Sequence, residues 1–280
     1  MATGANEFID VTTADVFLEE HWSKKATVAR EAELAFLKYG CDRQFEGELK
    51  KGQILRIQNI SNLSARAKSV NTAITYETVT ETETNITIDQ FYYAAYALED
   101  VIKPMVEASK LETYSSKLGY ALGLQEDSYV AAFVDDGTLN TVGTLATPLT
   151  YANLLRGDQY LNDANAPQEG RIIIIPPAEK ANFLGMDEFI HGDYAKVQGS
   201  KLVGSWMNYP IYVSTAVEGS NAAGHDSFMG HKECIAQVTQ IQPVVKTFYD
   251  IDYFCVKTAA LTTYAGTIRR ADHGVWMKSA

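Results

Sequence analysis

The most restrictive feature of this sequence is a segment that favours extended structure but offers no apolar side around which to build a core. The run "NTAITYETVTETETNITIDQFYYAAY", residues 71–96, is rich in Thr, Glu and Tyr. β-Branched and aromatic residues favour strands, but a buried strand must also present apolar residues on one face. We predict that this run pairs with a strand in "QILRIQNI", residues 53–60, and that the pair projects as a hairpin with a polar, basic tip.

A long helical pattern follows at residues 109–134. Leu111, Leu118 and Leu122 are among the apolar residues that recur close to every 3.6 positions. At 1.5 Å per residue, the predicted helix is roughly 39 Å long. A second amphipathic helix is predicted at residues 12–39, and because it is charged over much of its surface we expect it to lie on another surface.

Residues 139–219 alternate between strand and helix patterns, which is typical of a compact α/β lobe, and residues 234–278 return to strands. The most informative stretch of the lobe is "GRIIIIPPAEKANFLG", which begins at Gly170. A phosphate-binding turn here would need backbone N–H groups, which the two prolines lack. We therefore predict a strand whose four isoleucines are buried, followed by a helix that begins at Pro177 and carries Glu179 in its first turn.

Candidate metal ligands occur at His225, His231 and Cys234, which fall within a short segment. Zinc uses these ligand types, but a closed zinc site needs four ligands in a recognised spacing, and no fourth ligand is evident. We predict solvated histidines in a loop, with no metal ion and no cofactor.

Motifs for enzyme chemistry are equally weak. The segment "GSKLVGSW", residues 199–206, has the glycine spacing of a phosphate-binding loop but carries serine where that loop needs lysine. The sequence has no G-x-S-x-G motif. Adjacent acidic pairs such as Glu126-Asp127 and Asp135-Asp136 point apart on a helix, so we expect most of them to lie on a solvated face.

Charge and cysteine content narrow the class of protein. The net charge of -11 argues against gripping nucleic acid, which requires clustered Lys and Arg. The three cysteines, Cys41, Cys234 and Cys255, are widely spaced, which favours free, buried thiols. The sequence lacks both a bilayer-spanning apolar run and the pattern of a signal peptide, so we expect a protein that stays in a cytosol.

Taken in order, several stretches resemble the major capsid (coat) protein of tailed double-stranded DNA bacteriophages, which has the Hong Kong 97-like fold. "VFLEEHWSKKA" resembles the N-terminal arm of that family, "FEGELKKGQILRIQNI" its entry strand into an extended loop, and "ITYETVTETETNITIDQFYYAAYALEDV" the return strand. "GRIIIIPPAEKANFL" is similar to the strand, proline and short helix of the axial lobe, and "YDIDYFCVKTAALTTYAGTIRRADHGVWMK" to the closing strands. The resemblance covers nearly the whole chain.

The resemblance implies an α+β fold with an N-terminal arm, an extended β-hairpin loop, a peripheral domain with a long spine helix, and an axial α/β domain. The implied boundaries are residues 1–45 for the arm, 46–98 for the extended loop and its flanking strands, 99–138 for the peripheral domain, 139–233 for the axial domain, and 234–280 for closing strands that the two domains share.

The resemblance also implies a structural protein and not an enzyme. Its copies would form the pentamers and hexamers of an icosahedral phage head, assembled in the bacterial host cytoplasm, which encloses double-stranded DNA without binding it specifically. The implied partners are a separate scaffolding protein, a portal and a decoration protein, with no membrane. The extended loop would lie over a neighbouring subunit, and its candidate inter-subunit contact residues are Arg56, Arg66, Lys68, Glu77, Glu81 and Glu83.

Three other functions stay open on sequence grounds. An encapsulin-like nanocompartment shell would use the same fold to hold enzymes, and the neighbouring genes would distinguish it. A metal-dependent enzyme of unknown reaction would rely on His225, His231 and Cys234. A tail-tube or fibre protein fits less well, because such proteins are mostly strand and would not need the helix predicted at residues 109–134.

Overall fold

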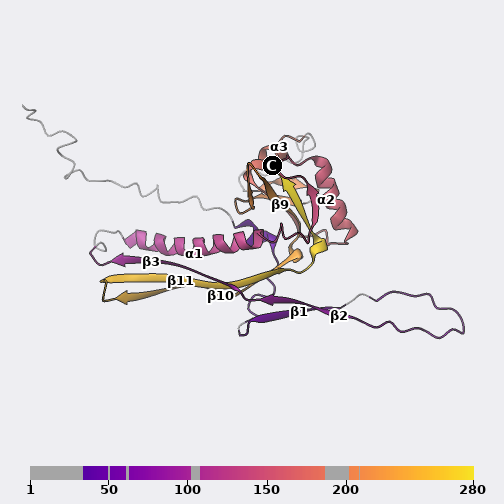
Figure 1. Ribbon diagram of the computed structural model, residues 1–280, viewed down its shortest axis with the longest axis horizontal. Helices are drawn as coiled ribbons and strands as arrows, with labels where there is room; N and C mark the ends of the chain where they lie inside the picture. Colours follow the sequence, from indigo (N-terminus) through magenta and orange to yellow (C-terminus); the bar gives the residue numbers. More distant parts are fainter. Residues whose placement is uncertain (1–33, 50, 61–62, 102–107, 187–201, 208) are drawn as a thin grey trace, which may run out of the picture. The chain divides into compact units, whose positions relative to one another are not determined.

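The computed structural model describes residues 34–49, 51–60, 63–101, 108–186, 202–207 and 209–280. Within these residues the strands form three sheets, of two, three and seven strands (Figure 1). None of the described helices is long and apolar enough to cross a membrane. The helix predicted at residues 12–39 lies outside the described residues except for its end, where a helical turn, η2 (Phe36–Gly40), is present.

The predicted projecting hairpin is present, although it is shorter than the sequence indicated. β1 (Ile54–Ile60) pairs antiparallel with β2 (Glu81–Thr87), so that Ile54 lies opposite Thr87. At the base of this hairpin, Ile57 and Ile86 are buried in one apolar cluster with Val238. The base is therefore anchored to the rest of the protein by packing, while the loop that joins the two strands is not.

The prediction that residues 71–96 form one arm of this hairpin is wrong. Residues 71–80 are not a strand, and β3 (Gln90–Glu99) leaves the hairpin to pair antiparallel with another strand, β11 (Cys255–Ile268). The physical reason is the alternation within β3: Ala94 and Tyr96 share one side and pack against leucines of the long helix. This half of the run therefore has a half-buried apolar face, which is hard to recognise in the sequence beside the Thr-rich and Glu-rich other half.

The three-stranded sheet has the order β10-β11-β3, with β10 (Ile235–Asp250) at one edge. Pro243 has no N–H to donate, and it lies where the pairing register shifts between Ile241 and Val244, on the edge strand that tolerates proline best. The long helix α1 (Ala108–Ala131) lies along one face of this sheet (Figure 1), which confirms the helix predicted at residues 109–134.

The seven-stranded sheet mixes parallel and antiparallel pairs. Its order is β4-β12-β9-β5-β7-β6, with β8 paired to β9. The pairs β4–β12 and β5–β7 are parallel and the others are antiparallel. The bounds of its strands and of the two helices of this lobe are β4 (Asn140–Gly143), α2 (Tyr151–Asp163), β5 (Arg171–Ile175), α3 (Pro177–Leu184), β6 (Leu202–Trp206), β7 (Tyr209–Val213), β8 (Gly219–Ser220), β9 (Gly224–His231) and β12 (Gly274–Ser279).

The prediction of a strand buried on both sides is confirmed for β5. Ile173, Ile174 and Ile175 have no exposed surface, and Ile172 is 5% exposed. Because successive side chains of a strand point to opposite faces, alternate isoleucines belong to two different apolar clusters, one on each side of the sheet. β5 therefore joins the two main cores of this lobe.

The helix after β5 also begins as predicted, at Pro177, with Pro176 in an extended conformation at the N-cap. Its Glu179 has a role that the sequence did not indicate. This side chain is completely buried, and its Oε1 accepts a hydrogen bond of 2.6 Å from the backbone N–H of Ala280. The carboxylate thus holds the end of the chain against α3 in addition to lying at the positive end of the helix dipole.

Two short turns connect the seven-stranded sheet to the three-stranded sheet. β9 continues through η5 (Lys232–Cys234) into β10, and β11 continues through η6 (Ala271–His273) into β12. The carbonyl oxygen of Cys234 accepts hydrogen bonds from the backbone N–H groups of Arg269 and Arg270, at 2.8 and 3.2 Å. The two crossings therefore lie side by side, and we call this region the neck.

Candidate functional site

The loop that joins β1 to β2 presents side chains to solvent over its whole described length, residues 63–80. Several of these side chains are apolar: Val70 is 90% exposed and Tyr76 is 87% exposed. A folded chain rarely gathers exposed apolar side chains without a partner for them. The loop therefore has the character of a contact surface rather than of a solvent-facing connection.

All six candidate contact residues lie on this hairpin, and most of them meet one another within the same chain. Arg56 lies 3.5 Å from Glu83 across β1 and β2, and Arg66 lies 3.9 Å from Glu77 within the loop. Lys68 donates a hydrogen bond of 3.0 Å to the carbonyl oxygen of Ser69 and a second to that of Thr72. Glu81 lies on β2 opposite Ile60.

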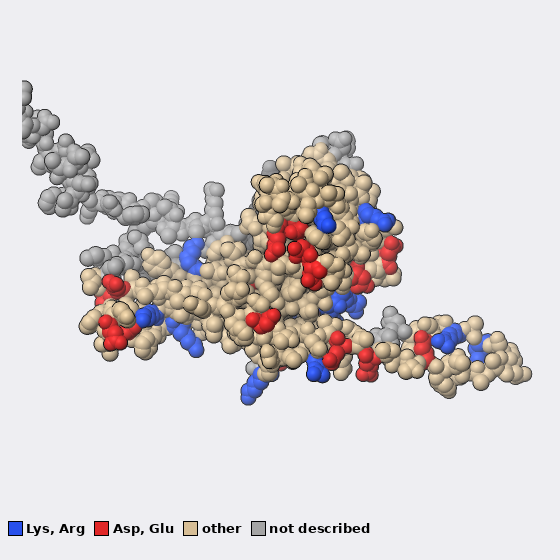
Figure 2. Space-filling view, in the orientation of Figure 1, with Lys and Arg blue, Asp and Glu red and all other residues tan. Residues whose placement is uncertain are grey.

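Charges of both signs are spread along the hairpin (Figure 2). In the Arg56–Glu83 pair the two side chains are 66% and 47% exposed, so water screens the attraction. Exposed pairs of this kind stabilise a protein by about 0–1 kcal/mol. Such pairs can be exchanged at little energetic cost for charges on another molecule.

One face of the three-stranded sheet carries α1, while much of the opposite face has no cover among the residues that the structure describes. The antiparallel register places Tyr93 opposite Leu261, and Leu261 opposite Val244, so these three side chains point to the same side. Phe91 and Phe248 extend the patch on this side. Tyr93 is 75% exposed, Phe248 71% and Phe91 64%. We call this patch the bare sheet face; it is a large apolar surface on a protein that otherwise buries its core.

The same side of the sheet is covered closer to the neck. Ala265 of β11 points to the same side as Leu261 and is buried in the cluster that includes Ile57 and Ile86 at the base of the hairpin. The base of the β1–β2 hairpin therefore covers this part of the sheet. Beyond that cover the apolar residues of the sheet are exposed.

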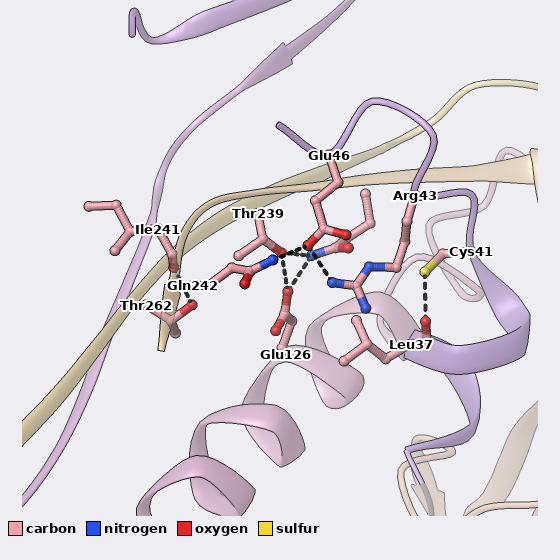
Figure 3. Close-up of polar contacts among 10 residues, drawn as sticks. Leu37, Cys41, Arg43, Glu46, Glu126, Thr239, Ile241, Gln242 and Thr262 are labelled. Carbon is pink, nitrogen blue, oxygen red and sulfur yellow. Dashed lines mark hydrogen bonds and ion pairs between the residues drawn. The ribbon is translucent and has the colours of Figure 1, made fainter. Parts of the chain in front are cut away.

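A buried polar cluster connects α1, β10 and the segment that follows η2. Glu126 of α1 points toward β10, where its Oε1 accepts hydrogen bonds from the Thr239 hydroxyl at 2.7 Å and from the Gln237 amide (Figure 3). Nearby, Glu46 accepts from Arg43 at 2.6 Å and from the Gln242 amide at 3.3 Å (Figure 3). These contacts hold three segments that are distant in sequence in one arrangement.

The expectation of a solvated face is wrong for Glu126 and Asp127, which are 5% and 0% exposed. The two neighbours do point apart, but α1 is covered on both of those sides. Asp127 Oδ1 accepts a hydrogen bond of 2.7 Å from the backbone N–H of Leu37, so it holds the start of the described chain against the helix. Asp135 and Asp136 are exposed, as expected.

Burial raises the pKa of Asp127 to about 6, although hydrogen bonds from the backbone N–H groups of Leu37 and Phe36 oppose the rise. Because an unfolded Asp has a lower pKa, the folded chain holds this proton more tightly. The stabilisation that this group contributes is present below the unfolded pKa and is lost as the pH rises through about 6.

The Asp127→Asn variant is therefore expected to lose less stability than the wild type between pH 4 and pH 7. The amide oxygen of Asn can still accept from Leu37, while its charge does not change with pH. Over this pH range, the wild type should lose up to about 3 kcal/mol more of its free energy of unfolding than the variant loses. Urea unfolding across this pH range measures it, and parallel pH profiles for the two proteins would contradict the assignment.

The sequence reasoning did not identify Arg171, which is 2% exposed at the start of β5. It borders a cavity of about 800 Å³ that Tyr39, Tyr212 and Lys232 also line. Its guanidinium group donates to Asp158, Asn162 and Tyr209 and to two backbone carbonyl groups, so its donors are engaged within the chain. The only feature of the sequence that could have indicated a buried Arg171 is its position directly before a run of four isoleucines.

The candidate metal ligands of the sequence analysis do not come together. His225 and His231 lie at opposite ends of β9, and His225 contacts Asn221 at 3.0 Å. The prediction of solvated histidines in a loop is wrong for His231, which is buried at the end of this strand. The three cysteines are free and buried, as predicted. Burial raises the pKa of the Cys41 and Cys234 thiols to about 12, which disfavours the reactive thiolate.

No protein-family model and no curated protein matches this sequence. Solved structures do match it. A structure of Mycobacterium phage Che8 is 20% identical, with a TM-score of 0.74, over 93% of this chain and 97% of its own. The capsid structure of the cyanophage P-SCSP1u is 17% identical, with a TM-score of 0.71, over 96% of this chain and 94% of its own. The capsid of Ralstonia phage GP4 is 10% identical, with a TM-score of 0.70, over 99% and 98%.

These likenesses establish the fold. The chain has the α+β fold of phage capsid structures, as the resemblance in the sequence implied. At this level of identity the fold is what the comparison establishes.

Proposed function

We propose that this chain is the structural major capsid protein of a tailed double-stranded DNA bacteriophage. The observation that carries the proposal is the extent of the fold match: known capsid structures are covered almost from end to end, as is this chain. Many copies would form the pentamers and hexamers of an icosahedral head. The protein would be a component of the virion with no enzymatic activity, assembled in the host cytoplasm.

The exposed apolar surfaces support this proposal because they suit contacts between copies. The loop at residues 63–80 carries apolar side chains that none of the described residues covers, and the bare sheet face carries others. Closer to the neck, Ile57 and Ile86 at the base of the hairpin already pack on the same side of the sheet, in one cluster with Ala265 of β11. The loop of a neighbouring copy would extend the same kind of packing over Tyr93 and Phe248.

The charged residues of the hairpin would then act between copies. Arg56, Arg66 and Lys68 would meet acidic groups of a neighbour, and the candidates Glu77, Glu81 and Glu83 would meet basic groups. Each contact would be weak, but contacts repeated around a ring act together. The net charge of -11 suits a shell that encloses DNA without holding it specifically.

The family boundaries give the remaining parts of the proposal. Residues 1–45 would be an arm, 46–98 the extended loop, 99–138 the peripheral domain with α1 as its spine, 139–233 the axial domain, and 234–280 the shared closing strands. A separate scaffolding protein, a portal and a decoration protein would be its partners. No observation favours a nanocompartment shell or a metal-dependent enzyme in place of this role.

Electron microscopy of the chain expressed with its scaffolding protein tests the proposal. We expect closed shells with five-fold and six-fold rings of subunits, and particles from the natural source that contain double-stranded DNA. A chain that stays monomeric at every concentration with the scaffold present would overturn the proposal. Source particles filled with an enzyme cargo in place of DNA would identify a nanocompartment shell.

A further inference from the structure

Two histidines and a glutamate meet at the neck. His231 ends β9, Glu233 lies in η5 and His273 lies in η6. One ligand atom from each side chain lies within 4.8 Å of the others. Both histidines are 3% exposed, and Glu233 is half-buried. The cluster thus combines imidazole nitrogen and carboxylate oxygen atoms in a site that is largely shielded from water.

The pairing of β9 with β12 brings His231 and His273 together. β9 and β12 are antiparallel neighbours with Gly230 opposite Gly274, so the residue after the first glycine, His231, lies beside the residue before the second, His273. The hydrogen bonds from Arg269 and Arg270 to the Cys234 carbonyl oxygen fix η5 against the approach to η6. The three side chains therefore project from positions that the sheet and the neck hold in place.

Backbone groups fix the orientation of the His231 ring. The ring donates a hydrogen bond to the backbone carbonyl of Glu169, and its Nδ1 accepts a long contact of 3.3 Å from the backbone N–H of Glu233, which a metal ion at Nδ1 would replace. A Cβ atom at Gly170 would lie 3.1 Å from Nε2, so glycine at this position leaves room for the ring. Histidine ligands in metal sites usually donate their second nitrogen to a backbone carbonyl or carboxylate in this way.

His273 provides an independent observation. Its Nδ1 is buried and has no hydrogen-bond partner in the part of the chain that the structure describes. A buried polar atom without a partner is unfavourable, and native proteins rarely contain one without a reason. A bound cation would supply the missing partner.

We propose that His231, Glu233 and His273 bind a divalent transition-metal ion such as Zn²⁺, with water in the fourth position. Zinc takes imidazole nitrogen and carboxylate oxygen ligands at about 2.0–2.2 Å, which separates tetrahedral ligand atoms by about 3.4 Å. The ligand atoms, which lie within 4.8 Å of one another, would have to move closer together to bind the ion. Lys232, Arg270 and Arg171 are nearby cations and Asp272 is a nearby anion, so the Glu233 carboxylate is needed to favour a cation here.

The ion would link η5 to η6 and so fasten the two crossings of the neck to each other. This role is independent of the proposed capsid function, because a single unassembled chain contains all three ligands. It also differs from the ligand set considered in the sequence, since only His231 is common to both. His273 is far from His231 in sequence, and only the pairing of β9 with β12 brings them together.

Zinc binding by the unassembled, tag-free chain tests the proposal. After removal of metal with a chelator, the protein is titrated with Zn²⁺ in competition with a chromophoric chelator. We expect one ion per chain, a higher melting temperature with zinc than after chelation, and visible d–d absorption when Co²⁺ replaces zinc. Glu233→Gln and His273→Gln should each lower the affinity at least about tenfold.

His225→Gln is the matched control, because it removes a histidine from the far end of the same strand and should leave zinc affinity unchanged. Glu233→Gln keeps the shape of a half-buried side chain, so circular dichroism should find this variant folded even if His273→Gln is not. A wild-type chain that binds no zinc at micromolar concentration overturns the proposal. So does wild-type affinity in Glu233→Gln, or an equal loss of affinity in His225→Gln.

Discussion

Replacement of Phe248 by glutamate is expected to prevent shell assembly at concentrations where the wild type assembles, while leaving the subunit folded. Phe248 lies on the bare sheet face and is 71% exposed in the single chain, so the fold does not depend on its contacts. Within an interface its burial would stabilise each contact by about 1.5–3 kcal/mol. The variant loses this term and in addition places an unpaired charge in an apolar contact.

The expected effect is a rise of at least about 100-fold in the subunit concentration that assembly requires, since each 1.4 kcal/mol corresponds to a factor of ten. Light scattering and electron microscopy against subunit concentration measure it. Phe248→Leu is the matched control, because it keeps an apolar side chain at the same position and should still assemble. Tyr93→Glu changes the same face from another strand and should behave as Phe248→Glu does. Assembly of Phe248→Glu at the wild-type concentration would remove the bare sheet face from the proposal.

Replacement of Ile174 by alanine is expected to lower the free energy of unfolding by about 2–5 kcal/mol. The side chain is completely buried in β5 and belongs to the cluster that includes Phe36 and Val130, while its neighbours in the strand fill the cluster on the other side. Alanine leaves a cavity that the surrounding strands cannot close, because β5 pairs with a strand at each edge. A large loss of stability should follow.

Urea unfolding measures this loss on subunits below the concentration at which they assemble, since assembly itself stabilises the folded state. Leu155→Ala on α2 is the comparison, because that side chain is 42% exposed and its loss should change stability by less than about 1 kcal/mol. If both variants lost the same small amount, β5 would not be the joint between two cores that its burial indicates.

The sequence was sufficient for features that rest on local pattern. The helix α1, the strand β5 with its isoleucines, and the start of α3 at Pro177 follow from periodicity and from the backbone chemistry of proline, both of which act over a few residues. The hairpin was predicted from a run that favours strands but is mostly polar, and only its base, at Ile57 and Ile86, is buried. Its candidate contact residues do lie on β1, β2 and their loop.

Features that depend on what covers a surface could not be predicted in this way. The alternation in β3 is compatible with either a solvated arm or a strand under a helix, and only the position of α1 decides between them. Glu126 and Asp127 look like surface residues until η2 and β10 cover both sides of the helix. To predict the bare sheet face, one must know how three strands pair with one another. To predict that His231 lies beside His273, one must know that β9 pairs with β12.

The strands of the three-stranded sheet extend far from the neck, so a small rotation there would be amplified at their far end. β10 and β11 run outward from η5 and η6 for 16 and 14 residues. At about 3.3 Å per residue, such a strand reaches roughly 50 Å from the neck. If the sheet rotated by only about 5° at the neck, the far turn would be displaced by about 4 Å, which is comparable to the separation of neighbouring strands. A small change in the two short turns would thus appear at the far end of the sheet as a movement large enough to make or break a contact.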